Sequence, residues 1–91
     1  MIYLNVRHTV ADYEKWRSFF DGDKSRRKAG GATGEEQVYC DANNPNIVTT
    51  LMAWDTMENA WKFANDPKLA EVMKQAGVIG RPELIAVLKP A

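Results

Sequence analysis

The sequence predicts an α+β fold in which strands and helices follow one another in the order βαββαβ. Three observations support this prediction. Four segments have the apolar, alternating or β-branched composition of strands, and two longer regions repeat apolar residues at helical spacing. Clusters of glycine, asparagine and proline separate these segments. A length of 91 residues suits one domain, so we expect residues 1–91 to form a single unit.

Apolar and polar side chains alternate along residues 2–8, which is typical of a strand. Ile2, Leu4 and Val6 would share one face of it. The period then changes, because large apolar residues recur every three or four positions. These residues are Tyr13, Trp16, Phe19 and Phe20.

This spacing predicts a helix that begins after Asp12 as N-cap and stops at Gly30 and Gly31. Gly22 lies within the helical region and favours a break there.

Two strands, 35–41 and 47–54, are expected to form an antiparallel hairpin. The residues between them, 43–46, read Asn-Asn-Pro-Asn, a composition that favours a turn. The second strand is rich in β-branched and apolar residues.

The second helical region is expected to begin at Asp55, which forms a capping pair with Glu58. Asp66 followed by Pro67 predicts a second helix start, since aspartate is a good N-cap and proline is favoured at the first helical position. Gly77 ends the region, and residues 83–89 read as the final strand.

This order predicts a ferredoxin-like fold, with a four-stranded antiparallel sheet and helices on one face only. Strands 47–54 and 83–89 are nevertheless apolar on both faces. A second apolar face needs a cover, and a two-fold symmetric pair is the commonest protein assembly. We therefore expect a homodimer formed through the sheet faces, a dimeric α+β barrel.

Composition excludes several classes of function. Twelve basic residues balance twelve acidic ones, so no global charge attracts nucleic acid or a membrane. Cys40 is the only cysteine, and no secretory signal precedes the first strand, which favours the cytoplasm. With His8 as the only histidine, the sequence contains no metal-ligand cluster, and we expect neither a metal nor another cofactor.

Few residues are candidates for chemistry. His8 is either a base near neutral pH or a hydrogen-bonded structural group; a lone histidine without a nucleophile favours the structural role. The glycine-rich stretch 30–34 follows a helix, whereas phosphate-binding loops lead into one. The basic cluster 24–28 is expected to complement the helix dipole rather than to bind an acidic ligand.

The aromatic residues are more informative. Five of them should approach the helix-covered face of the sheet, either as core or as the lining of a small-molecule cavity. They are Tyr13, Trp16, Phe20, Trp61 and Phe63. Asn5 and Arg7, together with His8, are candidates for polar groups that point from the first strand into the same layer.

The pattern resembles the dimeric α+β barrel superfamily, and within it the domains similar to antibiotic biosynthesis monooxygenases. The resemblance spans nearly the whole chain and rests on short motifs. They are Val6-Arg7-His8, Asp12-Tyr13-x-x-Trp16, Asn44-Pro45-Asn46, Trp54-Asp55, Asp66-Pro67, Ala76-Gly77-Val78 and Pro82-Glu83.

The resemblance implies a cofactor-independent monooxygenase, in which the carbanion of an aromatic or polyketide-like substrate reduces oxygen. Trp16 and Trp61 would then stack on the substrate, and Asn5 or Arg7 would hold its enolate. Members of this group often carry histidine where this chain has Phe63 and Lys68. Haem-degrading relatives need an axial histidine on the second helical region, and its absence between residues 55 and 80 disfavours that activity.

Three functions remain open at this stage. The first is an oxygenase or related proton-transfer enzyme that binds a small, partly aromatic molecule between helices and sheet. The second is a non-catalytic ligand-binding or stress-associated dimer. The third is a structural dimer whose rings fill its own core. Because this fold supports unrelated chemistries, the choice among these functions depends on the groups that line the space between helices and sheet.

Overall fold

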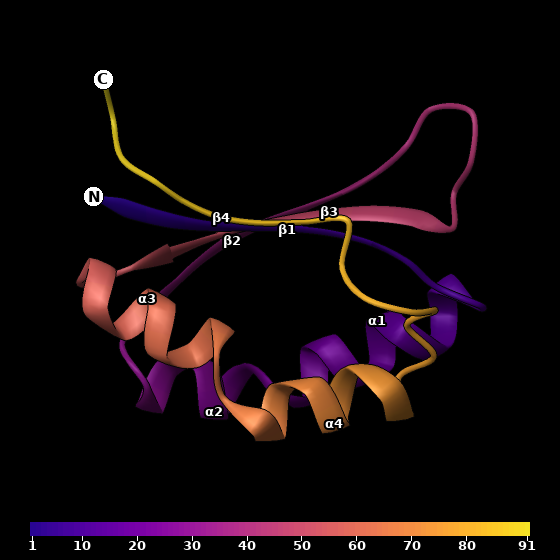
Figure 1. Ribbon diagram of the computed structural model, residues 1–91, viewed down its shortest axis with the longest axis horizontal. Coiled ribbons are helices and arrows are strands. Elements are labelled where there is room, and N and C mark those ends of the chain that lie inside the picture. Colours follow the sequence, from indigo (N-terminus) through magenta and orange to yellow (C-terminus); the bar gives the residue numbers. More distant parts are fainter.

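Four strands form one antiparallel sheet, and four short helices cover one of its faces (Figure 1). The computed structural model describes all residues, 1–91. The elements are β1 (Ile2–Thr9), α1 (Tyr13–Gly22), α2 (Lys24–Ala29), β2 (Ala32–Cys40), β3 (Ile47–Trp54), α3 (Met57–Ala64), α4 (Pro67–Gln75) and β4 (Leu84–Leu88). None of these helices is long and apolar enough to cross a membrane.

The strand order β2-β3-β1-β4 confirms the predicted ferredoxin-like fold. β1 lies at the centre and pairs with β3 on one side and β4 on the other; Leu4, for example, is opposite Met52 and Val87. Because side chains alternate along a strand, Leu4, Val6 and His8 share one face, and all three are buried. This is the face that the helices cover.

The first helical region is broken at Gly22, as predicted. α1 ends at Gly22 and α2 starts at Lys24. The backbone N–H of Glu14 donates to the side chain of Asp12 at 3.0 Å, so the predicted N-cap is confirmed. α2 continues to Ala29, where Gly30 takes the C-cap position.

The predicted hairpin is present, but its first strand is longer than expected. β2 begins at Ala32 rather than 35, and its pairing with β3 is irregular between Ala32 and Glu36. Thr33 and Gly34 fall within this irregularity, which explains why alternation did not reveal the strand start. In the turn, Asp41 accepts hydrogen bonds from the backbone of the two residues 43 and 44.

The start of α3 differs from the prediction. Thr56, not Asp55, is the N-cap, because its hydroxyl accepts the hydrogen bond from the backbone of Asn59 at 3.1 Å. Asp55 instead accepts from the backbone N–H of Thr56 at 2.7 Å and from the side chain of Asn59 at 3.0 Å. The predicted restart is confirmed, since Asp66 caps α4 through the backbone N–H of Lys68.

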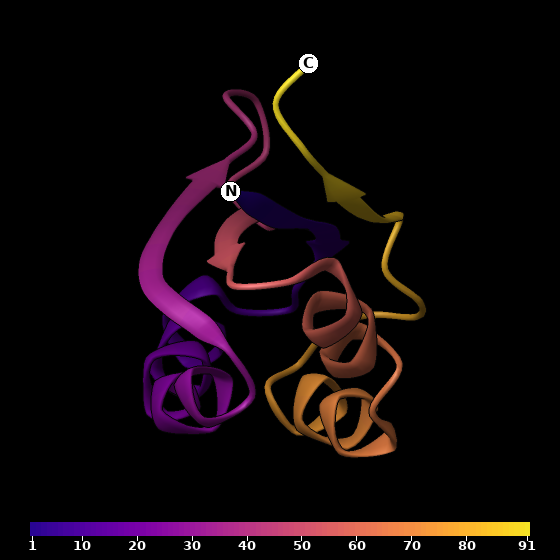
Figure 2. The same ribbon diagram turned by 90° about the vertical axis from the view of Figure 1, so that its left-hand side faces the viewer.

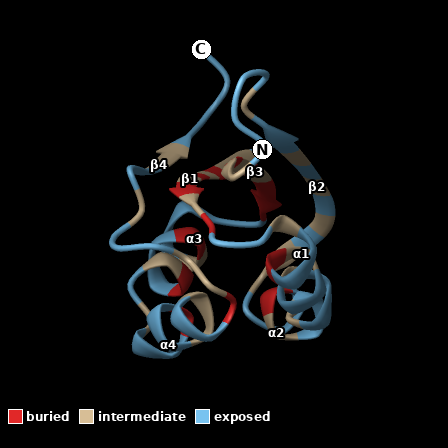
Figure 3. Cartoon of the chain, turned by 90° about the vertical axis from the view of Figure 1, so that its right-hand side faces the viewer, coloured by how far each residue is buried: buried red, intermediate tan, exposed pale blue.

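The helices lie in two pairs beneath the sheet (Figure 2). α1 and α2 run below the side of the sheet that carries β2, whereas α3 and α4 run below the side that carries β4. Buried residues line the space between sheet and helices (Figure 3). One core group contains Leu4, Met52, Trp54 and Phe63, and a second contains Val10, Trp16 and Val48.

A pair of glycine substitutions tests this backbone. Gly31 has φ +120°, and a Cβ there would lie 2.5 Å from Oδ1 of Asp55. Gly22 has a negative φ and open space around its Cα. We expect Gly31→Ala to lower the free energy of unfolding by about 1–3 kcal/mol, because it combines backbone strain with a steric clash. Gly22→Ala should leave that free energy unchanged or raise it by about 0.5 kcal/mol.

Urea titration followed by circular dichroism measures both variants. Equal stability of the two variants would contradict the positive φ at Gly31.

Candidate functional site

A cavity of about 50 Å³ lies between the helix-covered face of the sheet and the helices. Both helix pairs contribute to its wall, together with β1 and β3. Ten of its fourteen lining residues are apolar: Val6, Trp16, Phe19, Phe20, Met52, Phe63, Leu69, Val72, Met73 and Ala76. Four are polar: His8, Asp23, Arg27 and Thr50. Such a volume holds a few water molecules, whereas cavities known to bind benzene have a volume of about 150 Å³.

His8 reaches this cavity because β1 alternates. It follows Leu4 and Val6 on the same face, and only 3% of its surface is exposed. No protein group hydrogen-bonds to either of its ring nitrogens. Its ring meets that of Trp16 edge to face, with 5.4 Å between the ring centroids. The imidazole is thus fixed by aromatic packing, and both nitrogens remain available to a bound molecule.

Burial lowers the pKa of His8 to about 4, although the negative charge of Glu83 opposes this shift. A buried imidazole loses the hydration that stabilises its charged form. His8 is therefore neutral at pH 7. A neutral imidazole has one N–H donor and one nitrogen that accepts, so it can accept a proton or a hydrogen bond from a ligand.

Arg27 provides a buried charge at another part of the cavity wall. Its exposed fraction is 2%. Nη1 donates to the carbonyl oxygen of Phe20 at 2.8 Å, and Nη2 donates to Oε2 of Glu36 at 3.2 Å. The guanidinium carbon lies 3.9 Å from the centroid of the Phe20 ring, a close cation–π contact. The third donor position, Nε, is buried and has no protein partner.

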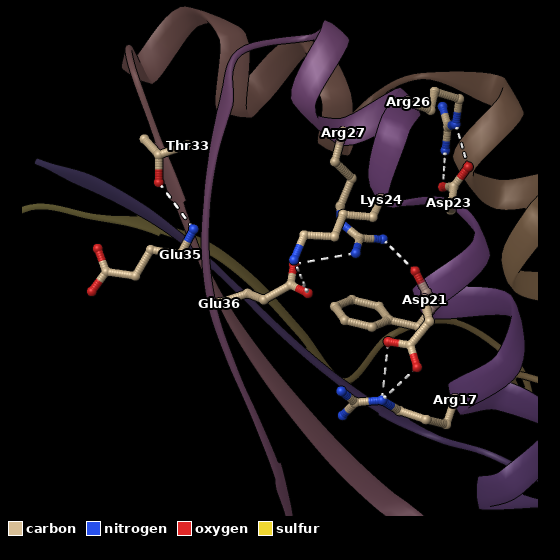
Figure 4. Close-up of polar contacts among 10 residues, drawn as sticks. Arg17, Asp21, Asp23, Lys24, Arg26, Arg27, Thr33, Glu35 and Glu36 are labelled. Carbon is tan, nitrogen blue, oxygen red and sulfur yellow. Dashed lines mark hydrogen bonds and ion pairs between the residues drawn. The ribbon is translucent and has the colours of Figure 1, made fainter.

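Further charges surround this arginine (Figure 4). Glu36 is shared, since its other carboxylate oxygen lies 3.8 Å from Nζ of Lys24. The adjacent Arg26 binds Asp23 in a bidentate pair at 2.8 and 2.9 Å and also reaches Asp66 at 3.4 Å. Arg26 therefore links the start of α2 to the N-cap of α4, so it joins the two helix pairs.

The structure brings three of the five predicted aromatic residues to the cavity: Trp16, Phe20 and Phe63. Tyr13 and Trp61 do not line it. Tyr13 packs beside Trp16, with 5.9 Å between ring centroids. Trp61 is 40% exposed, because it is one position from Ala60, which occupies the buried side of α3. The prediction that Trp61 faces the sheet is therefore wrong.

The predicted orientation of Asn5 and Arg7 is also wrong. They alternate with the buried residues of β1 and so lie on the helix-free face, away from the cavity. There, Nε of Arg7 lies 3.2 Å from a carboxylate oxygen of Glu83. Of the three polar candidates on β1, the structure places only His8 in the cavity.

Arg27 is a buried, charged residue of the cavity wall that the sequence analysis did not single out. A signal was present, because Arg27 follows Phe20 by seven positions and Trp16 by eleven, which is the same helical face. The basic residues on either side of it made the segment resemble a solvated helix end. No group of three His, Cys, Asp or Glu side chains lies close enough to hold a metal ion.

Comparison with known proteins supports the fold. No protein-family model matches the sequence, and no curated protein matches it. Solved structures do match. A candidate antibiotic biosynthesis monooxygenase from Bordetella bronchiseptica superposes with a TM-score of 0.77 at 12% identity, over 99% of this chain and 96% of that one.

A second match is a variant of SnoaB, a cofactor-independent oxygenase from Streptomyces nogalater, with a TM-score of 0.72 at 12% identity; 98% of this chain and 91% of that one are covered. A third match is another candidate antibiotic biosynthesis monooxygenase, from Deinococcus radiodurans. It superposes with a TM-score of 0.68 at 13% identity, over 100% of this chain and 93% of that one. These whole-chain matches confirm the predicted resemblance in fold.

The low pKa of His8 gives a testable pH dependence. Between pH 6.5 and about 4 the unfolded chain binds a proton at His8 that the folded protein does not. The free energy of unfolding should therefore fall as the pH is lowered through this range, by roughly 3 kcal/mol from His8 alone. His8→Phe should remove this part of the slope.

Denaturant titrations of both proteins at a fixed protein concentration, from pH 7 to pH 4, measure the difference. Parallel curves would show that the folded protein does not depress the pKa of His8.

Proposed function

We propose that this protein is a cytoplasmic homodimer that binds a small aromatic or polyketide-like molecule in the cavity between helices and sheet, which widens to admit it, and that it oxidises this molecule without a cofactor. The alternative is a non-catalytic ligand-binding or stress-associated dimer with the same cavity. One observation carries the enzymatic proposal: His8 is buried in an apolar cavity with both ring nitrogens unpartnered. A structural histidine would use at least one of them.

The reaction needs a proton acceptor and a dry site. A ring methylene beside a carbonyl loses a proton to His8 and becomes an enolate. The enolate then transfers electrons to O₂. Overall, the methylene loses two hydrogen atoms and gains one oxygen atom as a new carbonyl, and the second oxygen atom leaves as water. An apolar wall strengthens the electrostatic contacts that stabilise the enolate.

The low pKa of His8 limits its strength as a base, and this is the observation that favours the non-catalytic alternative. The developing negative charge of an enolate would raise the pKa of the adjacent imidazole as the proton moves. Only a substrate whose C–H or O–H bond is already acidic can react in this way. Anthrones and dihydroxyaromatic compounds meet this condition.

The homodimer is supported by the helix-free face of the sheet. No helix covers this face (Figure 1). It carries Leu51, Leu84 and Leu88, of which Leu84 and Leu88 are 44% and 42% exposed. A second copy would bury these side chains. Oδ1 of Asn5, on the same face, has no hydrogen-bond partner within the chain.

Oxygen uptake tests the enzymatic proposal. Purified protein is incubated in air with anthrone and with 1,8-dihydroxyanthrone in an oxygen electrode. We expect uptake above background, and we expect His8→Gln to lower the rate by at least 10²-fold, since positioned proton transfer contributes about that much. Lys74→Gln, on the exposed surface of α4, should keep the full rate.

Background uptake with both substrates would end the oxygenase proposal and leave the binding alternative.

The oligomeric state tests the dimer. Leu51 lies at the middle of β3 on the helix-free face, so Leu51→Lys would place a charge in the centre of the proposed interface. Light scattering at micromolar concentration should give twice the mass of one chain for the wild type and the mass of one chain for this variant. Ala70→Lys adds the same charge to the exposed surface of α4 and should remain dimeric. A monomeric wild type would refute the proposal.

A further inference from the structure

At one end of the helical layer, backbone atoms hold the two helix pairs together. The segment before α1 meets the segment after α4 there. The backbone N–H of Ala11 donates to the carbonyl oxygen of Gly77 at 2.9 Å, and Val10 forms an antiparallel bridge with Val78. Val10 is also fully buried in the core. This join depends on no polar side chain, so we expect it to stay closed while other parts of the layer move.

At the other end, a single side chain joins the two helix pairs. Nη1 of Arg26 on α2 lies 3.4 Å from a carboxylate oxygen of Asp66, the N-cap of α4. The same guanidinium lies 5.0 Å from the centroid of the Phe63 ring on α3. Arg26 and Asp66 are both partly exposed, with 24% and 43% of their side-chain surfaces in contact with solvent. Exposed ion pairs add little to stability, so this join opens more easily than the backbone one.

Between these two joins, α1 and α4 lie along a groove. The nine residues of α4, Pro67–Gln75, span about 14 Å. Over this length no hydrogen bond or ion pair connects α4 to α1. An open groove of about 360 Å³ follows the line between them, with Phe19 and Gly22 of α1 on one side and Val72 of α4 on the other. We call this line the α1–α4 seam.

Phe19 separates the groove from the cavity. It lines both spaces, as do Asp23 and Val72. Phe19 is 37% exposed, so its ring is in contact with solvent on one side and with the cavity on the other. Exposed side chains change rotamer within nanoseconds, and such a change requires no unfolding of α1. Displacement of this ring would connect the cavity with solvent.

Asp23 connects the ion pair at the end of the seam to Phe19. Its carboxylate binds Arg26 in the bidentate pair shown in Figure 4 and gives no hydrogen bond to the start of α2. Its backbone N–H donates to the carbonyl oxygen of Phe19 at 3.1 Å. A movement of Arg26 is therefore transmitted to the turn of α1 that carries Phe19.

We propose that small molecules enter the cavity through the α1–α4 seam, with Phe19 as the gate and the Arg26–Asp66 ion pair as the latch. This inference rests on the proposed binding function, because it specifies how a cavity of about 50 Å³ widens to admit a larger molecule. The backbone join between Ala11 and Gly77 is the hinge. Opening breaks the ion pair and moves the start of α4 away from α2, while the sheet keeps its register.

Cysteine labelling measures this opening without any ligand. Cys40→Ser first removes the only native thiol, which is exposed. Thr50→Cys then places a thiol on the cavity wall, at a position that is 2% exposed. In a second protein, Ala60→Cys places a thiol in the core outside the cavity lining, at a fully buried position. The rate of reaction with methyl methanethiosulfonate, a small uncharged reagent, reports the opening that exposes each thiol.

The gate is tested by Phe19→Ala. This substitution removes the ring that closes the cavity, so it should raise the labelling rate at position 50 at least tenfold more than the rate at position 60. The ratio of the two rates is the measured quantity, because a general loss of stability would accelerate both reactions equally. Equal acceleration at the two positions would show that the whole domain opens and would overturn the seam as the entrance.

The latch is tested by Asp66→Asn, which removes the charge but keeps a good N-cap residue for α4. It should raise the same ratio about two- to fivefold, the fold-change expected for one partly exposed ion pair. Sodium chloride at 1 M should raise the ratio in the parent protein but not in this variant, because salt screens the ion pair. Arg17→Gln removes an exposed ion pair with Asp21 within α1 and should leave the ratio unchanged. An unchanged ratio in Asp66→Asn would overturn the latch.

Oxygen uptake separates this inference from the proposed function. The Cys40→Ser protein is incubated with anthrone in the oxygen electrode. Uptake together with equal acceleration at positions 50 and 60 would leave the oxidation standing and refute this entrance. Gated labelling at position 50 without uptake would support the entrance and end the oxygenase proposal.

Discussion

The alternation of side chains along β1 determines which of its residues enter the core and the cavity and which face away from the helices. β1 is one of the two inner strands and pairs on both sides, so its register is held by two neighbours. Leu4, Val6 and His8 enter the layer below the sheet, and Asn5 and Arg7 face the other way. A shift of one residue would exchange the two sets and place a salt-bridged arginine in the core. The position of the imidazole in the cavity follows from this register alone.

Arg27 shows how a small domain keeps a charge inside. Removing a guanidinium from water is costly, and one ion pair seldom compensates fully. Here Glu36, the carbonyl of Phe20 and the face of the Phe20 ring each offset part of that cost. Replacement of the ion pair by apolar groups of similar size is often neutral or stabilising in other proteins. The ion pair therefore need not be the most stable arrangement for this position.

The sequence was sufficient to predict the fold but only part of the site. The period of two in 2–8, the break at Gly22 and the cap at Asp66 each depend on local chemistry, and the structure contains all three. The side of the sheet that each residue faces was harder to predict. Alternation separates the residues of a strand into two sets, but it does not show which set the helices cover. The orientation of Asn5, Arg7 and Trp61 depended on that choice.

Arg27 was missed for a related reason. Its burial results from α2, a six-residue helix that packs under β2, and its partner Glu36 is nine positions away on that strand. The basic residues beside it, which include the exposed Lys28, concealed the helical spacing that places Arg27 on the same face as Phe20. The resemblance to monooxygenase-like domains identified the fold without locating this residue.

Asp66 has two structural roles that a single substitution would remove together. One of its carboxylate oxygens caps α4, and the other receives Arg26 from α2. Loss of this carboxylate, as in Asp66→Ala, would weaken the first turn of α4 and would also remove the ion pair between the two helix pairs. The start of α4 and the spacing between the two helix pairs that enclose the cavity are thus coupled through the side chain of Asp66.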